Sequence, residues 1–366
     1  MISRGAVRLS AAVMTHPGRL TAARALRDAL PELDLRIVVD PDPGRPDSCI
    51  RNSRRAWALS EPSATHHLVL QDDVRICSSF SARLLKAVGE RPDEAVSLFT
   101  EWGSYTSYAV RLSALAGMTW APVIDPYVPA VGLVLPRASA RAFSTDADLS
   151  VLQDDVALDR LLHAHDVRTS VVVPNLVEHL EGESLVGNQH MGVRHASYFD
   201  DFKAPAGDHT HEVRADDPAM DVPVFATDVL RPVAALYDGA RSSWSPGSFK
   251  EFLDRQQLDA SKVLEVGPAG GRAVRELLDL ELSEAGQRVL GGVRCVVYAL
   301  GFQAGRFGRH RELRNRRSLA TVAPGALRWT MTPEALAAIG EPINVLLDDA
   351  ADRGFADGVA RRDRQE

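Results

Sequence analysis

The chain has 366 residues, of which 45% are hydrophobic and 25% are charged, a balance that is ordinary for a soluble globular protein of two or three domains. Its net charge of -7 does not favour binding to nucleic acid or to an anionic membrane surface. Cys49, Cys77 and Cys295 stand far apart without a C-x-x-C motif, which argues against a zinc ribbon and against a disulfide framework.

From residue 7 to about residue 180, short apolar runs alternate with amphipathic segments. Strands are predicted over residues 7–14, 35–40 and 67–73, with helices over residues 19–30 and 49–60 between them. This β-α-β-α-β order predicts a Rossmann-like α/β domain with a mostly parallel sheet flanked by helices. Further strands are predicted over 95–102, 130–136 and 169–179, and further helices over 79–90, 135–144 and 152–166.

Residues 203–223 are polar, contain Pro and Asp and lack periodicity, which indicates a linker or an exposed excursion. We therefore predict a catalytic α/β domain over residues 1–205, a linker over 206–224 and a smaller accessory region over 225–366. The accessory region is predicted to be mixed α/β or mostly helical, with a helix over 248–258, a strand-loop-helix unit over 262–280 and an apolar strand over 293–302. Its arginine-rich run over 306–317 indicates a solvated helix face, with a polyanionic acceptor or nucleic acid as the alternative.

Two adjacent aspartates, Asp72 and Asp73, follow the third predicted strand. Ligands of parallel sheets bind at the carboxyl ends of the strands, where Asp40 and the loop "THPGR" over residues 15–19 are also expected. A carboxylate pair that faces a nucleotide diphosphate suits Mg²⁺ or Mn²⁺, because these ions prefer carboxylate and phosphate oxygens. The alternative is that the two aspartates begin a turn and cap the next helix.

The run "HLVLQDDVRICSSFSARLL" resembles the metal-binding segment of GT-A glycosyltransferases, notably the family-25-like and related bacterial enzymes. Three other segments agree in their order. Residues 13–30 resemble the first strand and nucleotide-loop helix, residues 152–162 the acidic helix on the acceptor side, and residues 173–187 the segment after the last sheet strand. The resemblance covers about residues 8–200, and Gln71 stands where these enzymes usually have Glu.

This resemblance implies a hexosyltransferase that moves a sugar from a nucleotide-diphosphate sugar, with a UDP-sugar favoured, to an acceptor hydroxyl with the help of Mn²⁺ or Mg²⁺. It implies that Asp73 ligates the metal and that Asp72 contacts a metal-bound water or the ribose. His179 is then the third metal ligand or a contact to the diphosphate. The alternative for His179 is a histidine that caps a strand end or pairs with Glu178.

Asp154 and Asp155 begin a predicted helix, and one of them is the predicted general base of an inverting reaction. In a retaining reaction the same carboxylate would orient the acceptor. The alternative is that the two carboxylates cap the helix N-terminus and interact favourably with the helix dipole. In the loop 15–19, Thr15 and the helix amides are predicted to bind uracil or ribose and Arg19 a phosphate, unless the loop is a plain Pro-Gly turn capped by Thr15. Asp40 is predicted to hold the nucleoside or to belong to a solvated turn.

Other signals compete with this interpretation. "HAHD" over residues 163–166, with His66 and His67, contains the ligand types of a two-metal hydrolase, but we favour a surface position for "HAHD" and a strand edge for His66 and His67. "KVLEVGPAGGRAV" over residues 262–274 is similar in shape to the S-adenosylmethionine loop of class I methyltransferases, and a plain helix cap is favoured. The alternative functions are a non-catalytic nucleotide-binding or interaction protein on the same fold, and a methyltransferase-like C-terminal module.

No segment approaches the length and apolarity of a membrane-spanning helix, and the N-terminal residues lack the apolar core of a signal peptide. Together with the cysteine usage this predicts a cytoplasmic protein. The resemblance to GT-A glycosyltransferases implies that its partners are the nucleotide-sugar and the acceptor. The sequence disfavours nucleic acid as a partner and leaves the oligomeric state open.

Overall fold

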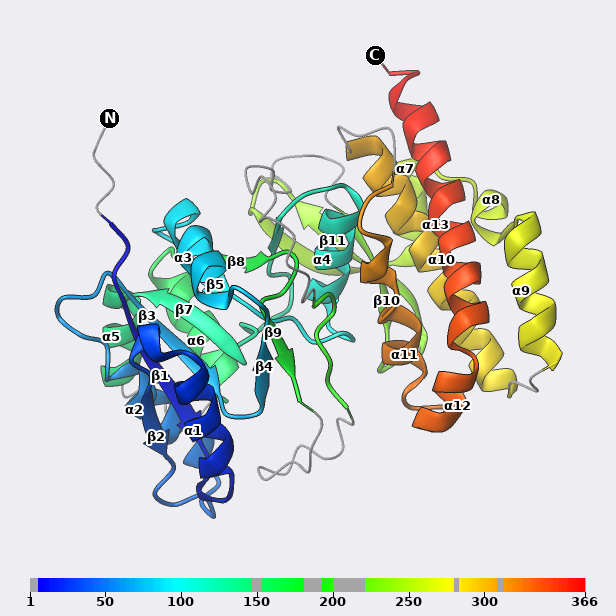
Figure 1. Cartoon of the computed structure of the whole chain (residues 1–366). Helices are drawn as coiled ribbons and strands as arrows, with labels where there is room; N and C mark the ends of the chain where they lie inside the picture. Colours follow the sequence, from blue (N-terminus) through cyan, green and yellow to red (C-terminus); the bar gives the residue numbers. More distant parts are fainter. Residues whose placement is uncertain are drawn as a thin grey trace. The chain divides into compact units, whose positions relative to one another are not determined.

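The computed structural model of the chain describes residues 6–146, 153–180, 193–199, 221–279, 283–307 and 313–365. Contacts divide the chain into two compact units (Figure 1). Unit 1 comprises Met1–Thr100, Asp125–Met191 and Phe199–His209, and unit 2 comprises Glu101–Ile124, Gly192–Tyr198 and Thr210–Glu366. The linker predicted over 206–224 lies mostly outside the described residues, and strand β10 (Val222–Ala226) begins within its last residues.

A seven-stranded sheet forms the centre of the α/β fold, with the strand order β2-β1-β3-β7-β5-β8-β6. Strand β1 runs parallel to β2 and β3, and β5 runs parallel to β8, whereas β7 is antiparallel to β3 and β5. The predicted α/β class with a mostly parallel sheet is therefore confirmed. The strands are β1 (Leu9–Thr15), β2 (Arg36–Val39), β3 (His66–Gln71), β5 (Ala95–Ser97), β6 (Trp120–Pro122), β7 (Gly132–Pro136) and β8 (Thr169–Val172).

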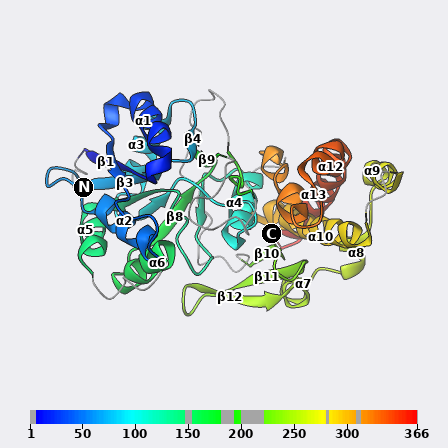
Figure 2. The ribbon, with the colours of Figure 1, turned by 90° about the horizontal axis from the view of Figure 1, so that it is seen from below.

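Helices of unit 1 cover both faces of the sheet (Figure 2). One face carries α1 (Leu20–Ala29) and α3 (Phe80–Glu90), and the other carries α2 (Ser48–Trp57), α5 (Arg137–Thr145) and α6 (Asp154–Ala164). Each of these helices lies inside a segment that the sequence predicts as a helix or overruns it by one residue; α2 begins at Ser48, one residue early, and α5 ends at Thr145, one residue late. The β-α-β-α-β order expected for the first part of the chain is also the order observed.

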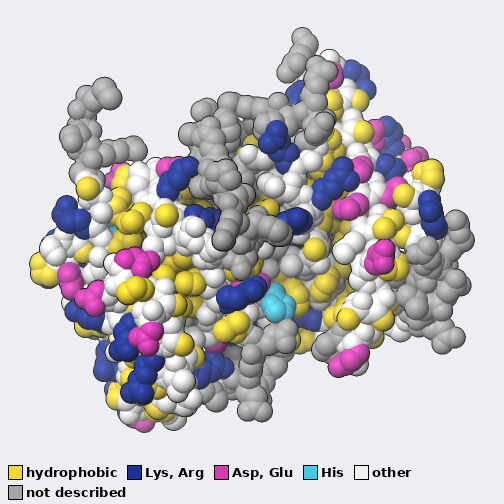
Figure 3. All heavy atoms as spheres, in the orientation of Figure 1, with side chains coloured by type: hydrophobic (Ala, Val, Ile, Leu, Met, Phe, Trp, Pro, Cys, Tyr) yellow, Lys and Arg dark blue, Asp and Glu magenta, His cyan; other side chains and the backbone are white. Residues whose placement is uncertain are grey.

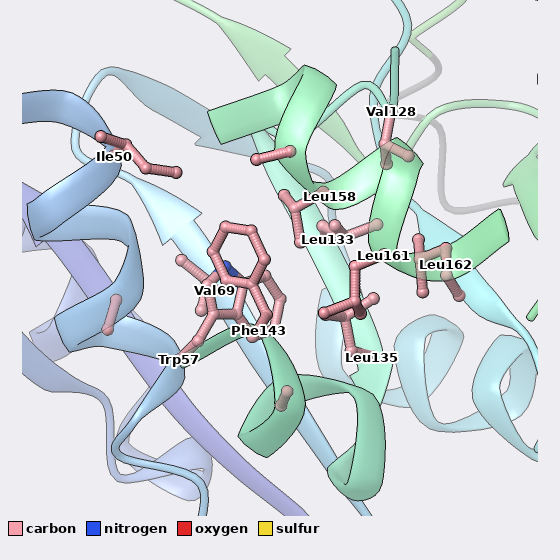
Figure 4. Packing of buried hydrophobic residues seen from close by; sticks show 14 of the residues in the cluster. Ile50, Trp57, Val69, Val128, Leu133, Leu135, Phe143, Leu158, Leu161 and Leu162 are labelled. Carbon is pink, nitrogen blue, oxygen red and sulfur yellow. The ribbon is translucent and has the colours of Figure 1, made fainter. Parts of the chain in front are cut away.

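The core under α2, α5 and α6 is built from side chains of these helices and of the sheet (Figure 4). Trp57 of α2 and Phe143 of α5 are almost fully buried and lie beside Val69 of β3. Burial of each such side chain stabilises the fold by roughly 1.5–3 kcal/mol. Because successive residues of β3 point to opposite faces, His67 and Val69 share this face of the sheet. The packing holds the sheet rigid up to the strand ends that carry the candidate site.

Residues 169–179, predicted as one strand, form two. Strand β8 ends at Val172, and β9 (Val177–His179) leaves the main sheet to pair antiparallel with β4 (Val74–Ile76). Pro174 lies between them and has no amide hydrogen for a ladder bond, so a continuous strand is disfavoured there. The strand predicted over 95–102 is likewise realised only as β5, Ala95–Ser97.

Helix α4 (Tyr105–Leu115) is absent from the sequence-based prediction. All of its residues from Thr106 to Leu115 are buried, including Arg111, so the segment lacks the polar face that makes a helix recognisable. Inside unit 2, Arg111 donates to the Ser107 hydroxyl at 2.5 Å and to the carbonyl of Trp102 at 2.9 Å. Neutral acceptors thus compensate this buried guanidinium, and burial lowers its pKa to about 10.

Unit 2 contains a three-stranded antiparallel sheet and a set of helices. The strands pair in the order β10-β11-β12, with β11 (Arg231–Asp238) in the centre and β12 (Ser243–Ser248) at one edge. The remaining elements are α7 (Phe249–Gln256), α8 (Ala260–Leu264), α9 (Pro268–Asp279), α10 (Glu284–Phe307), α11 (Val322–Leu327), α12 (Pro333–Ala338) and α13 (Gly340–Arg362). The strand predicted at the start of 262–280 is therefore wrong, since that segment is helix α8. The strand predicted over 293–302 is also wrong, because those residues lie inside α10.

The long helices α10 and α13 approach each other through glycines. A Cβ atom on Gly301 would overlap the carbonyl oxygen of Ala351, and one on Gly354 would overlap that of Tyr298. Gly305 of α10 and Gly358 of α13 stand in the same way against the partner helix, so each helix carries a Gly-x-x-x-Gly pair at the contact. At successive contacts the residue numbers increase in the same direction along both helices, so α10 and α13 run parallel to each other. The two helix backbones can approach this closely because glycine has no side chain.

Basic and acidic side chains are interspersed on the face of the molecule that Figure 3 shows, in keeping with the modest net charge. Part of the arginine-rich run over 306–317 is described. Within unit 2, Arg306 donates to Gln256 at 2.6 Å and Arg316 contacts Asp352 at 2.9 Å. In the portion of the chain that the structure describes, no helix is both long and apolar enough to cross a membrane.

Candidate functional site

His179 lies next to the aspartate pair because of the small ribbon formed by β4 and β9. Asp72 and Asp73 occupy the turn between the end of β3 and the start of β4. Val74 pairs with His179 in the antiparallel register, and the amide of Leu180 donates to the carbonyl of Asp73 at 2.8 Å. The imidazole Nε2 of His179 is then 3.3 Å from Oδ2 of Asp73. His179 and the aspartate pair, which the resemblance assigns to one metal or diphosphate site, are therefore direct neighbours in unit 1.

Arg19 supplies the positive charge at the aspartate pair. The chain turns after β1 into a short 3-10 helix (Pro17–Arg19), which is capped by His16, whose Nδ1 accepts from the amide of Gly18 at 3.0 Å. This turn brings Nη1 of Arg19 to 2.5 Å from Oδ2 of Asp73 and to 3.4 Å from Oδ1 of Asp72. Arg19 was expected to meet a phosphate; here it forms ion pairs with both carboxylates.

Asp72 is held by the end of strand β1. The Thr15 hydroxyl donates to its Oδ2 at 2.5 Å, and the amide of His16 donates to the same oxygen at 3.1 Å. The Asp72 side chain is only 7% exposed, and burial raises its pKa, an effect that the hydrogen bonds and the charge of Arg19 only partly oppose. Thr15, expected to bind a nucleoside, is thus directed to Asp72. His16 rather than Thr15 is the capping residue of the turn.

Asp73 behaves oppositely to its neighbour. Burial alone would raise the pKa of Asp73, but the hydrogen bonds and charges of His179 and Arg19 outweigh it and leave the pKa below its ordinary value. Asp73 is therefore the firmly ionised member of the pair, and Asp72 is the member that binds a proton more readily. Adjacent carboxyl groups whose pKa values are pushed apart are typical of functional sites.

A second acidic group, the Cys49 cluster, consists of Asp40, Cys49, Ser53, Asp154 and Asp155. The Cys49 thiol donates to Oδ1 of Asp154 at 3.6 Å, and Ser53 also hydrogen-bonds to Asp154. Burial raises the pKa of Asp154, while these two partners and the amides at the start of α6 lower it to a smaller extent. Oδ1 of Asp155 accepts from the amide of the next residue, Val156, at 2.8 Å in the first turn of α6.

Asp40 links the Cys49 cluster to the end of β1. Its amide donates to the carbonyl of Thr15 at 2.9 Å, and its Oδ1 accepts from the amide of Asp42 at 3.0 Å. Asp40 is 8% exposed, and its side chain closes a turn of its own backbone. Its negative charge also contributes to the raised pKa of the Cys49 thiol. Both acidic groups therefore stand at the carboxyl ends of neighbouring parallel strands, as the alternation of strands and helices predicts.

The predicted divalent metal would have to use Asp73 and His179 as ligands. These two residues meet at Oδ2 of Asp73, and Arg19 already contacts that oxygen at 2.5 Å. A metal cation at the same oxygen would be repelled by this guanidinium, which already neutralises the carboxylate. Among the described side chains, no group of three or more His, Cys, Asp or Glu could hold a metal ion. The arrangement does not fit the expected Mn²⁺ or Mg²⁺ site.

The histidines of the competing hydrolase hypothesis have structural roles. His66 and His67 are buried in β3, a strand inside the sheet between β1 and β7, so the prediction of a strand edge is wrong. His67 contacts the Ser10 hydroxyl through Nδ1 at 2.7 Å and the carbonyl of Ala56 through Nε2 at 3.0 Å. Because a carbonyl only accepts, Nε2 carries the proton and Nδ1 accepts from Ser10. His163 of the "HAHD" segment is exposed on the last turn of α6, which confirms its surface position.

The glycine-rich loop before α9 does not have the setting of a methyltransferase loop. It follows helix α8 instead of a strand, and the amide of Gly267 donates to the Asp349 carboxylate at 3.0 Å. A Cβ on Gly267 or Gly270 would collide with the same carboxylate. An aspartate of α13 thus occupies the place where a bound anion would be expected.

Three residues of the two groups were missed in the sequence. His16 contributes its amide to Asp72, and Cys49 and Ser53 contact Asp154. Cys49 and Ser53 are four residues apart on α2, which places them on one helix face, and this spacing is the signal that was available. This spacing points to a site only once α6, which carries Asp154, lies beside α2 in the folded chain.

The likeness to GT-A glycosyltransferases rests on four segments of this chain and on their order. The structure brings residues from each of these segments, namely Arg19, Asp73, Asp154 and His179, to one unit. The fold is compatible with a Rossmann-like α/β domain. In comparisons of the whole chain, no protein-family model and no curated protein matches it.

Proposed function

We propose that unit 1 binds a nucleotide-diphosphate sugar at the carboxyl edge of its sheet and transfers the sugar to an acceptor hydroxyl. The observation that carries this proposal is Oδ1 of Asp73, which is buried and has no hydrogen-bond partner among the described groups. A buried acceptor left without a donor costs about 1–3 kcal/mol. A hydroxyl of the ribose or of the donor sugar would satisfy it, at the edge of the sheet where ligands of such folds bind.

In this proposal Asp154 takes the proton of the acceptor hydroxyl. Its raised pKa places it closer to the working range of a general base than an exposed aspartate would be. As the acceptor oxygen bonds to the anomeric carbon, the bond from that carbon to the phosphate oxygen breaks and the nucleoside diphosphate leaves. Arg19 and His179 stand beside Asp73, where their N–H groups would stabilise the negative charge of the leaving diphosphate.

The proposal is tested with the full chain and a panel of nucleotide-diphosphate sugars, by measuring release of the nucleoside diphosphate over time. We expect turnover of one donor, loss of at least about a hundredfold in Asp73→Asn, and normal turnover in the control Asp28→Asn, which alters an exposed acid on α1. Full activity of Asp73→Asn would remove Asp73 from the site. Absence of both binding and turnover across the panel would overturn the function.

A second candidate is a nucleotide-binding protein without catalysis on the same fold. The surroundings of Asp154 favour this function. Its carboxylate already accepts hydrogen bonds from Cys49 and Ser53, and these compete with a substrate hydroxyl for the same carboxylate. Calorimetry separates the two functions, because donor binding without release of nucleoside diphosphate supports the binding protein. The variant Asp154→Asn sharpens the test: it should abolish turnover and keep donor binding only if Asp154 is the base.

A further inference from the structure

The aspartate pair of unit 1 has a counter-ion within the chain. Nη1 of Arg19 lies 2.5 Å from Asp73 and 3.4 Å from Asp72, and the three side chains are between 7% and 22% exposed. Ion pairs that are this well shielded from water are screened much less by salt than surface pairs are. Removal of Arg19 would leave two buried carboxylates without the guanidinium that contacts both of them.

Most carboxylate oxygens of Asp72 and Asp73 already have a hydrogen-bond or ion-pair partner. Oδ2 of Asp72 accepts from the Thr15 hydroxyl and from the amide of His16, and Oδ2 of Asp73 faces both Arg19 and His179. Among the side-chain oxygens of this pair, Oδ1 of Asp73 is buried and has no hydrogen-bond partner in the described part of the chain. Mg²⁺ and Mn²⁺ are usually held by one or two carboxylates together with substrate phosphates and waters. Here the carboxylate oxygen without a partner lies next to a guanidinium that already neutralises the pair.

We propose that Arg19 takes the place of the divalent cation in this protein, so that the aspartate pair works with an arginine counter-ion and without a bound metal. This proposal rests on the proposed function, because it names the group that neutralises the aspartates at the donor site. The statement that no metal binds can be tested whichever donor the protein uses. Arginine suits this position because its guanidinium stays charged at any physiological pH and holds carboxylates in a fixed geometry.

The first experiment titrates the purified full chain with MnCl₂ and follows free Mn²⁺ by electron paramagnetic resonance. We expect no saturable site in the wild type and in the matched control Arg27→Gln, which alters an exposed arginine on α1, the helix that follows Arg19. Arg19→Gln should create one Mn²⁺ site at least tenfold tighter than any wild-type binding, and the double variant Arg19→Gln with Asp73→Asn should lose it. A saturable wild-type site that disappears in Asp73→Asn overturns the proposal, as does failure of folded Arg19→Gln to bind Mn²⁺.

A second measurement uses the wild type alone and does not depend on the folding of a variant. Its thermal unfolding midpoint should be the same in EDTA and in excess MnCl₂, and a rise of several degrees with the metal overturns the proposal. Donor affinity from calorimetry should also be unchanged by EDTA. If no donor binds under any condition, the proposed function fails, whereas the Mn²⁺ results still decide whether Arg19 replaces the metal.

Discussion

The imidazole Nε2 of His179 lies 3.3 Å from Oδ2 of Asp73, although the two residues belong to distant parts of the chain. The antiparallel ribbon of β4 and β9 causes this contact, because it pairs the residue after Asp73 directly with His179. Arg19 approaches the same oxygen from the turn after β1. Three separate segments of unit 1 thus converge on one carboxylate, and each contact carries a consequence that can be measured.

Asp73 should stabilise the protein in a pH-dependent way. Its pKa in the folded chain is below the ordinary value of 3.8, so its stabilising effect is fully present above that value and is lost as pH falls through the lower folded pKa. We expect Asp73→Asn to lower the free energy of unfolding at pH 7 by roughly 1–3 kcal/mol, with the deficit shrinking below about pH 4. Urea unfolding at several pH values measures this, and exposed Asp28→Asn should change stability by less than about 0.5 kcal/mol.

His67 should destabilise the protein in mild acid. Burial lowers its pKa from 6.5 to about 4, so the unfolded chain binds a proton in that interval while the folded chain does not. Stability should therefore fall as pH decreases from 6.5 to 4, with a contribution from His67 of about 1 kcal/mol per pH unit. His67→Gln should flatten this part of the stability curve. The exposed His163→Gln should leave the slope as it is, and an equal slope in both variants would contradict the assignment.

Cys49 should react slowly with alkylating reagents despite its exposed position. The negative charge of Asp154 is the main cause of its raised thiol pKa, and the thiolate is the reactive form. Asp154→Asn should accelerate iodoacetamide labelling of Cys49 at pH 8 by roughly tenfold, the effect of lowering the thiol pKa by one unit. Mass spectrometry of peptides identifies which cysteine is labelled. Cys77 and Cys295 are buried and should contribute little. Asp159→Asn on the same helix is the control and should leave the rate unchanged.

The contact between α10 and α13 should not tolerate a side chain at its glycines. A Cβ on Gly354 would overlap the carbonyl oxygen of Tyr298, and backbone cannot move aside as a side chain can. We expect Gly354→Ala to lower the free energy of unfolding by about 2 kcal/mol or more. Gly291→Ala on α10 meets nothing within 4 Å and should instead stabilise the helix by about 0.5–1 kcal/mol. Equal effects in calorimetric unfolding would show that the predicted crowding is absent.

The sequence predicts the first part of the fold well because its strands and helices differ in their local periodicity. It fails for α4, α8 and α10. Helix α4 is buried all round, so its apolar spacing has no period to detect. The segment 293–302, predicted as a strand, is a short apolar run inside α10, and such a run is compatible with either a strand or a buried helix. Only the neighbouring helix α13 and its glycines show which of the two it adopts.

By itself the sequence determined that Thr15, Arg19, Asp40, Asp72 and Asp73 gather at one edge of a sheet, because the carboxyl ends of parallel strands lie together whatever the details of packing. Which group neutralises the aspartates was decided by the tertiary structure. Arg19 and His179 are brought to Asp73 by a turn and by a strand pairing whose register no local pattern encodes. Charge compensation depends on distances of a few ångströms between segments far apart in the chain, and those distances exist only in the folded protein.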